Sequence, residues 1–365
     1  MASPPKTPEA VFYMHNFNKA LRTSLIFLVL VTVVSGVIAY PYFHSETYHY
    51  QDGYVRDSLA GSLDLIICGA SQAQRGISPA VLDEHLGSSS YNIGSPLMTI
   101  KARYTILEKE LSRNDVKLVI LELCYDALTR DRDVVGPEGD LYMMGRFTSF
   151  GERLRYFLSS ARLEEYADIH YDILYRGRMS KDVWGSYPIG SSDSYEMRGF
   201  EPLDPVPIEM IPEEKLHQEA ILTDIVDENL TYLEKILALC RDREIPVIMV
   251  ATPLSDSAIL SYDSLDVIHD FYTGISREWG CEYYNFSLYK GKSDLFPDSG
   301  AYYDRNHLGA PGAEVFSGLL AQVIENSRAG VDSSQLFYRS YAEAEQEAIL
   351  PRYGWEGGTG EAFIP

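Results

Sequence analysis

The chain has 365 residues and a formal net charge of −22, with 45% hydrophobic and 12% aromatic residues. A chain of this length and apolar content can bury one large core or two modest ones. The negative charge excludes nucleic acids and other polyanions as tight partners, because binding them requires a basic surface.

An uncharged, strongly apolar run occupies residues 23–43. At about 1.5 Å per residue it spans roughly 30 Å, the thickness of the hydrocarbon core of a membrane. Lys6, Lys19 and Arg22 precede the run, which predicts a cytoplasmic N-terminus (residues 1–22), a single-pass anchor in the cell membrane and an exported remainder. A cleaved signal peptide is the alternative, although the run is long for one and offers a poor cleavage site.

After a linker, residues 44–60, strand and helix patterns alternate over residues 61–326. Short apolar segments predict five strands, at 63–69, 90–93, 117–123, 246–251 and 282–286. Capped or amphipathic segments predict helices at 78–87, 99–113 (with Ile100, Tyr104, Leu107 and Leu111 on one face), 213–243, 263–279 and 311–326. The alternation predicts a parallel sheet covered on both faces, a three-layer α/β/α domain.

Two segments depart from this alternation. Residues 127–212 are rich in Tyr, Gly, Asp and Arg and contain several prolines, so we interpret them as an insertion that caps the sheet. Residues 327–365 are polar and contain several glycines, which predicts a C-terminal tail that is extended or partly disordered.

Cysteine and histidine patterns give no sign of a metal. The four cysteines have no CxxC or zinc-like spacing, and they lie in or next to apolar runs, which predicts free, buried thiols, with a disulfide as the alternative. The histidines other than His307 form no cluster of ligands, so we expect neither a metal nor a cofactor.

Three polar segments follow predicted strands, where open parallel sheets bind their ligands. Gly69-Ala70-Ser71-Gln72 follows the first strand, Asn92-Ile93-Gly94-Ser95 the second, and Asp304-Arg305-Asn306-His307 comes after the fifth. Taken singly, each can be an ordinary turn or helix cap. Together they supply a serine, an imidazole that can take its proton, and a carboxylate that can orient the imidazole.

These segments resemble the motifs of the SGNH/GDSL hydrolases over residues 61–326, outside the insertion. The shared features are Gly-x-Ser after the first strand, Asn-x-Gly after the second, and Asp-x-x-His before the last helix. The resemblance implies a flavodoxin-like SGNH hydrolase fold with Ser71 as the nucleophile. It also implies His307 as general base and acid, Asp304 as its orienting carboxylate, and the Gly94 N–H as an oxyanion donor.

The sequence departs from the family pattern at two places. Gly-Ala-Ser replaces the usual Gly-Asp-Ser, and Glu122-Leu123-Cys124-Tyr125-Asp126 stands where the family has Gly-x-Asn-Asp after the third strand. The family's asparagine oxyanion donor is therefore unassigned, with Asn92 and the Gln72 amide as alternatives. Removing one such donor typically costs about 2.7–4 kcal/mol of transition-state stabilisation.

The anchor and the segment around Ser71 are similar to exported bacterial branches of that family, which include teichoic-acid D-alanylation and exopolysaccharide O-acetylation proteins. The resemblance implies a serine esterase or O-acyltransferase that acts on acyl groups of a cell-surface glycan or glycolipid. It also implies a multi-spanning membrane O-acyltransferase as a partner. The alternative is a non-catalytic binding or assembly subunit of a surface-polymer modification complex, which the missing asparagine favours.

Overall fold

The computed structural model describes residues 17–34, 53, 55–132, 143, 146–149, 151–152, 155–156, 159 and 197–355. By its contacts the chain divides into two units, residues 1–50 with 162–189 and residues 51–161 with 190–365.

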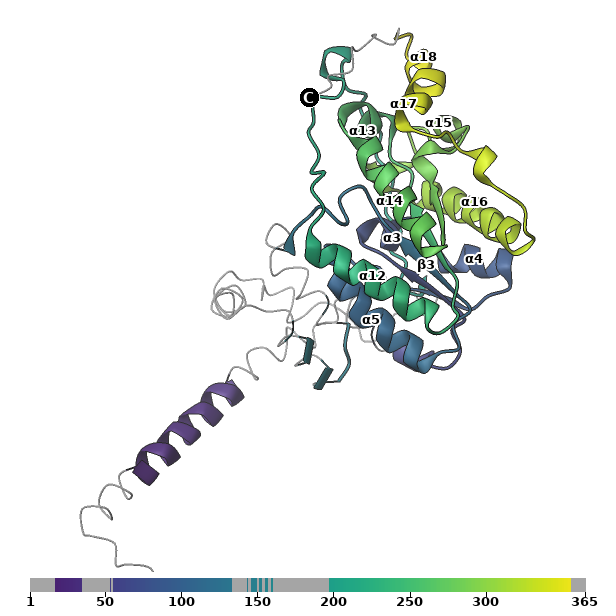
Figure 1. Ribbon diagram of the computed structural model, residues 1–365. Coiled ribbons are helices and arrows are strands. Elements are labelled where there is room, and N and C mark those ends of the chain that lie inside the picture. Colours follow the sequence, from purple (N-terminus) through teal and green to yellow (C-terminus); the bar gives the residue numbers. More distant parts are fainter. Residues whose placement is uncertain are drawn as a thin grey trace, which may run out of the picture. The chain divides into compact units, whose positions relative to one another are not determined.

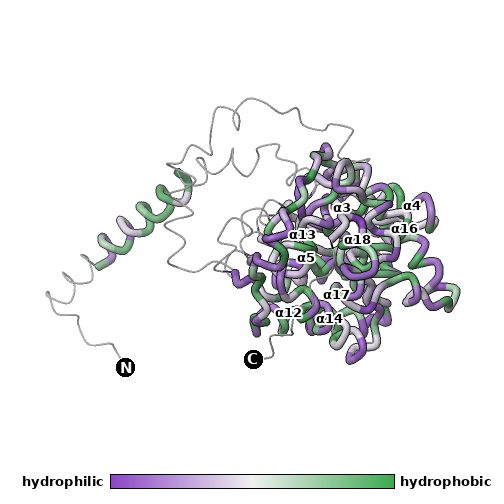
Figure 2. The backbone as a smooth tube through the Cα atoms, turned by 90° about the horizontal axis from the view of Figure 1, so that it is seen from above, coloured by the Kyte–Doolittle hydropathy of each residue, from purple (hydrophilic) through white to green (hydrophobic). Residues whose placement is uncertain are grey.

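The described part of the first unit is one helix, Phe17–Val34, which is apolar along most of its length (Figure 2). By length and composition it could cross a membrane, and an N-terminal signal sequence has the same properties. The helix begins before the predicted anchor, whose residues 35–43 lie outside the described part of the chain.

The second unit contains a parallel five-stranded sheet in the order β2–β1–β3–β4–β5. The predicted strands and their parallel arrangement are confirmed. This order is flavodoxin-like, and in such sheets ligands bind where the chain changes direction, beyond the carboxyl ends of β1 and β3. The strands are β1 (Leu65–Cys68), β2 (Ser90–Asn92), β3 (Leu118–Glu122), β4 (Val247–Ala251) and β5 (Glu282–Asn285).

Helices cover both faces of this sheet, which confirms the predicted three layers (Figure 1). Side chains alternate along each strand, so Ile66 packs into the core on one face while Leu65 and Ile67 pack into the core on the other. Burying one such side chain stabilises the fold by roughly 1.5–3 kcal/mol. The first face carries α5 (Ile100–Arg113), α12 (Asp227–Arg241) and α14 (Leu265–Trp279), and the second α3 (Ser71–Gly76), α4 (Pro79–Leu86) and α16 (Ala310–Arg328).

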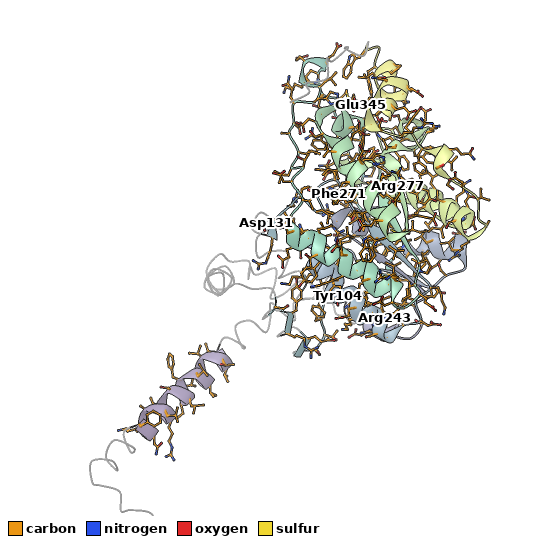
Figure 3. All side chains as sticks on the ribbon, in the orientation of Figure 1. Tyr104, Asp131, Arg243, Phe271, Arg277 and Glu345 are labelled. Carbon is orange, nitrogen blue, oxygen red and sulfur yellow. The ribbon has the colours of Figure 1, made fainter. Side chains whose placement is uncertain are left out.

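The buried face of α5 differs from the predicted one. Tyr104, labelled in Figure 3, is only half-buried, with its ring 5.8 Å from that of Tyr232. Arg103 and Glu110 lie in the buried face instead, where Glu110 forms a 2.8 Å ion pair with Arg56. The helix is enclosed by the sheet, by α12 and by the segment before β1. More of its surface is therefore buried than the spacing of its apolar residues predicts.

The predicted helix over residues 213–243 is too long, because α12 begins only at Asp227. Upstream, the Glu219 N–H donates to Ser261 O (2.9 Å) and Glu219 O accepts from the Asp263 N–H (3.1 Å). The backbone is thus paired with another segment and cannot form helical bonds. Leu222, which continues the helical spacing, is 57% exposed.

The prediction of an extended or disordered tail is wrong for residues 329–355. Short helices follow α16, and Tyr341 and Ile349 from them are buried against α13 (Asp256–Ser261). The tail is also joined to the main body by an ion pair from Glu345, labelled in Figure 3, to His217 (3.2 Å). The elements are η3 (Ser334–Leu336), α17 (Tyr341–Ala344), the π-helical turn η4 (Glu345–Ile349) and α18 (Leu350–Arg352).

The expected insertion, 127–212, lies partly outside the described residues, so its role as a cap stays a prediction. Its described C-terminal part pairs with the end of β2 through the Asn92 N–H and Arg198 O (2.9 Å). It also pairs with β6 (Tyr302–Asp304) through the Val206 N–H and Tyr302 O (2.7 Å).

All four cysteines are free thiols, as predicted. Cys68, Cys124 and Cys240 are buried, whereas Cys281 is half-buried. Burial raises the pKa of Cys68 and of Cys240 to about 12, which makes both thiols unreactive near neutral pH.

Candidate active site

Ser71 is presented by a tight turn between β1 and α3. A Cβ atom at Gly69 would lie 2.4 Å from Ala73 Cβ and 2.6 Å from Glu122 Oε2, so only glycine lets the turn pack this closely. Ser71 is the first residue of α3, at the carboxyl edge of the sheet.

His307 and Asp304 lie on a second structure at the same edge, the small hairpin of β6 and β7 (His307–Leu308). Asp304 Oδ1 accepts hydrogen bonds from the N–H groups of Asn306 (2.8 Å) and His307 (2.9 Å). Because these bonds fix the turn, the carboxylate and the imidazole point toward each other.

The structure brings the three predicted catalytic residues into one chain of hydrogen bonds. Ser71 Oγ lies 2.8 Å from His307 Nε2, and His307 Nδ1 lies 2.9 Å from both oxygens of Asp304. With Nδ1–H donating to Asp304, Nε2 is left as the acceptor for the Ser71 hydroxyl. This is the arrangement that activates a serine as a nucleophile.

The local electrostatics keep Asp304 ionised. Partial burial raises its pKa, but hydrogen bonds from His307 and from the Asn306 N–H outweigh that effect and hold the pKa below its usual range. A carboxylate in this position stabilises the imidazolium that forms when His307 takes a proton.

Ser71 and His307 line a cavity of about 110 Å³ at the carboxyl ends of β1 and β3. A larger cavity of about 430 Å³ lies at the opposite, amino end of β3, β4 and β5, and no histidine lines it. The smaller cavity, which Ser71 and His307 line, is therefore the candidate active site. Its lining is Ala70, Ser71, Gln72, Leu97, Met98, Thr99, Arg103, Cys124, Tyr125, Asp126, Ala127, Arg130, Asn306 and His307.

Asn92 and Gly94, the predicted oxyanion residues, do not line this cavity. The Gly94 N–H donates to Asn92 Oδ1 (2.9 Å), and Asn92 Nδ2 donates to the carbonyls of Ala73 (2.8 Å) and Ile77 (2.9 Å). In this structure the pair joins the end of β2 to α3, and both groups are already bonded within the protein.

Gln72 does line the cavity, and its side-chain Oε1 accepts from Thr252 Oγ1 (3.2 Å), which leaves the donor function to its Nε2. Its backbone is a second candidate. No side chain caps α3, and the Gln74 N–H makes the bond back to Ala70 O (3.1 Å), so the N–H groups of Ser71 and Gln72 have no intrahelical partner.

Glu122, which sequence reasoning treated only as a departure from the family pattern, contacts the nucleophile turn directly. It is completely buried, and its Oε2 accepts from the Ala70 N–H (2.9 Å). Burial raises the pKa of Glu122, and the nearby Arg103 and the Ala70 N–H offset only part of that shift. A lone acidic residue at the end of the apolar strand Leu-Val-Ile-Leu-Glu was the signal in the sequence.

No protein-family model matches this sequence, and no curated protein matches it. Solved structures with a similar fold include a protein from Desulfitobacterium hafniense DCB-2 assigned to the lipolytic G-D-S-L family (11% identity, TM-score 0.35, covering 72% of this chain and 99% of that one). Another is a protein from Bacteroides fragilis NCTC 9343 assigned as an acylhydrolase (10% identity, TM-score 0.37, covering 78% of this chain and 98% of that one).

A third similar structure is a gut microbial diltiazem-metabolizing enzyme (9% identity, TM-score 0.35, covering 72% of this chain and 47% of that one). At these identities and TM-scores the likenesses do not bear on function. The function has to be argued from the geometry around Ser71.

Proposed function

We propose that this protein is a serine esterase or O-acyltransferase of the SGNH type. The observation that carries the proposal is the contact of 2.8 Å between Ser71 Oγ and His307 Nε2, with Asp304 2.9 Å behind the imidazole. The cavity at the switch point of the sheet gives an ester access to Ser71.

The reaction follows from these contacts. His307 Nε2 takes the Ser71 hydroxyl proton while Oγ forms a bond to the carbonyl carbon of the ester, whose oxygen becomes negative. The ester C–O bond then breaks, and the imidazolium gives its proton to the departing alkoxide, which leaves an acyl group on Ser71. Water or a sugar hydroxyl gives a proton to His307 and attacks the acyl carbon; the bond from that carbon to Ser71 Oγ then breaks, and the imidazolium returns the proton to Oγ.

The choice of water or a hydroxyl as acceptor distinguishes a hydrolase from a transferase, and both use the same residues. The N-terminal apolar helix and the resemblance of the motifs to exported SGNH branches support a cell-surface glycan or glycolipid as the substrate. The same resemblance supports a multi-spanning membrane O-acyltransferase as the partner that supplies the acyl group.

A non-catalytic assembly subunit is the second candidate. The observation that favours it is the bonded state of the Gly94 N–H together with Glu122 in place of the family's Gly-x-Asn-Asp motif. A subunit of this kind needs no activated serine, so labelling of Ser71 separates the two candidates.

The test is covalent labelling by a fluorophosphonate together with hydrolysis of p-nitrophenyl acetate, using the full-length chain in detergent. Ser71→Ala, His307→Ala and the double variant should each lose about 10³-fold or more in kcat, and by similar factors, because the residues act as a unit. Ser71→Ala should also lose labelling.

Two exposed residues serve as matched controls, Ser112→Ala on α5 and His85→Ala on α4, and both should behave as wild type. Wild-type turnover by Ser71→Ala would exclude the serine mechanism. A wild-type protein that neither hydrolyses the ester nor becomes labelled would favour the assembly subunit.

A further inference from the structure

Arg103 is a buried cation beside the proposed nucleophile. It lies on the inner face of α5 and is only 1% exposed. Its Nε donates to Met98 O (3.3 Å) and its Nη1 to Glu122 O (2.5 Å), the last carbonyl of β3. These two bonds hold the guanidinium group rigidly at the carboxyl end of the strand.

Among the described residues Arg103 forms no ion pair, whereas the buried Arg56 and Lys292 each form one. Arg56 pairs with Glu110 at 2.8 Å and Lys292 with Asp256 at 2.6 Å, all four side chains being almost completely buried. Buried charges are normally paired, because an unpaired one is costly to remove from water.

The nearest acidic group, Glu122, does not fill this role. It contacts Arg103 through its backbone carbonyl, and no ion pair joins the two side chains. Burial raises the pKa of its carboxyl group, which favours the neutral acid. The hydrogen bonds of Arg103 among the described residues therefore go to neutral carbonyl groups and not to a carboxylate.

Arg103 lines the cavity of Ser71 together with Ser71 and His307. Within the part of the chain that the structure describes, its Nη2 makes no hydrogen bond. A residue with an unused donor, Nη2, thus lines the cavity that Ser71 also lines.

The catalytic site needs such a donor. Of the donors that the sequence predicted, the Gly94 N–H is used by Asn92, whereas Gln72 accepts from Thr252 through Oε1, and the backbone N–H groups at the start of α3 stay available. Donors that are fixed before the reaction stabilise a developing negative charge without reorganising, and they act most strongly in a water-poor cavity.

We propose that Arg103 is the side-chain oxyanion donor of this site, in place of the asparagine that the sequence lacks. As Ser71 Oγ bonds to the carbonyl carbon, the π electrons move onto the carbonyl oxygen, and Nη2–H donates to that oxygen. The proton of Ser71 passes to His307 Nε2, so the charge and atoms of the step balance. The proposal rests on the proposed esterase or acyltransferase function.

The test is steady-state hydrolysis of p-nitrophenyl acetate by the full-length protein in detergent. Arg103→Gln should lower kcat by about 10²–10³-fold with little change in KM, because the bond strengthens in the transition state. Arg103→Lys keeps a cation and should recover part of kcat. The control is Arg113→Gln on the same helix, outside the cavity, which should retain the wild-type kcat.

A second measurement separates a direct contact from a structural role. A boronic acid forms a tetrahedral adduct with an activated serine, and its Ki should rise by the same factor as kcat/KM falls across the Arg103 series. A lower kcat with an unchanged Ki would make Arg103 structural and overturn the proposal. If Arg103→Gln does not fold, Arg103→Lys decides by the same comparison.

Two further outcomes would also overturn it. An unchanged kcat in Arg103→Gln would show that Arg103 does not stabilise the oxyanion. A loss confined to esters with an anionic acyl group, such as a succinyl ester, would make Arg103 a substrate-binding residue instead. Failure of the proposed function is seen separately, as a wild-type protein that neither hydrolyses the acetate nor reacts with the fluorophosphonate.

Discussion

At the scale of single residues, the nucleophile turn depends on two buried side chains at the end of β3, those of Glu122 and Arg103. Glu122 Oε2 binds the Ala70 N–H at 2.9 Å, and Gly69 lets the turn approach that carboxyl group. On the other side, Arg103 holds the Glu122 carbonyl at 2.5 Å. The position of Ser71 thus depends on a carboxyl group whose ionisation is disfavoured by burial.

We predict that Glu122→Gln changes how stability depends on pH. A carboxyl pKa raised in the folded state means that the contribution of Glu122 is present at low pH and is lost as pH rises through the raised pKa. Each unit of such a shift corresponds to about 1.4 kcal/mol. Urea unfolding between pH 5 and 8 should show the wild type losing stability relative to Glu122→Gln.

The matched control for this experiment is the exposed Glu84→Gln, which should follow the wild-type curve. Parallel curves for wild type and Glu122→Gln would mean that the buried carboxyl group does not titrate over this range. That result would contradict the role of burial assigned here.

At the scale of elements, the C-terminal helices and the extended segment before α12 stabilise each other. His217 Nε2 contacts Glu345 Oε2 at 3.2 Å, and its Nδ1 contacts Tyr262 O at 3.0 Å. Tyr341 donates an amide N–H to Asp266 on α14 (2.6 Å) and is buried beside α13. The tail is therefore part of the folded body up to residue 355.

We predict that this ion pair makes stability depend on pH. The hydrogen bond with Glu345 raises the pKa of His217 to about 9, so the stabilisation is present below about pH 6.5 and is lost as pH rises through 9. Thermal unfolding should show the wild type losing more stability than Glu345→Gln between pH 6.5 and 9. Glu347→Gln, an exposed change in η4, is the control. Equal losses in wild type and Glu345→Gln would exclude the pair as the cause.

At the scale of the whole molecule, one apolar helix of 18 residues accompanies a strongly acidic chain. Lys19 and Arg22 lie in the first turns of that helix, and positive charge at a membrane-spanning end is retained on the cytoplasmic side. The proposed surface substrate requires the rest of the chain to be outside the cell.

We predict a single-pass protein with its C-terminal part exposed. Protease added to intact, wall-stripped cells should digest a C-terminal tag, while a cytoplasmic marker protein stays intact until lysis. Retention of the full mass in the membrane fraction distinguishes an anchor from a cleaved signal peptide. A C-terminal tag that is protected in intact cells and digested only after lysis would refute the assigned orientation.

The sequence by itself determined the layers of the fold and the members of the hydrogen-bonded chain. Strand and helix periodicities are local, so the five strands followed from runs such as 117–123. Ser71, Asp304 and His307 followed from polar segments placed after predicted strands, whose carboxyl ends meet at one edge, together with the resemblance of these segments to SGNH/GDSL motifs. Their contact distances came from the structure.

Tertiary structure decided what depends on neighbours distant in the sequence. Helical spacing around Leu222 was overridden by pairing with residues 261–263, and the polar tail proved to carry enough apolar side chains to cover α13. In the same way, the sequence placed Arg103 in an amphipathic helix without showing which way it faces. Only packing against the end of β3 places Arg103 at the cavity that Ser71 lines, because burial and cavities arise from contacts between elements and not from the order of residues within one.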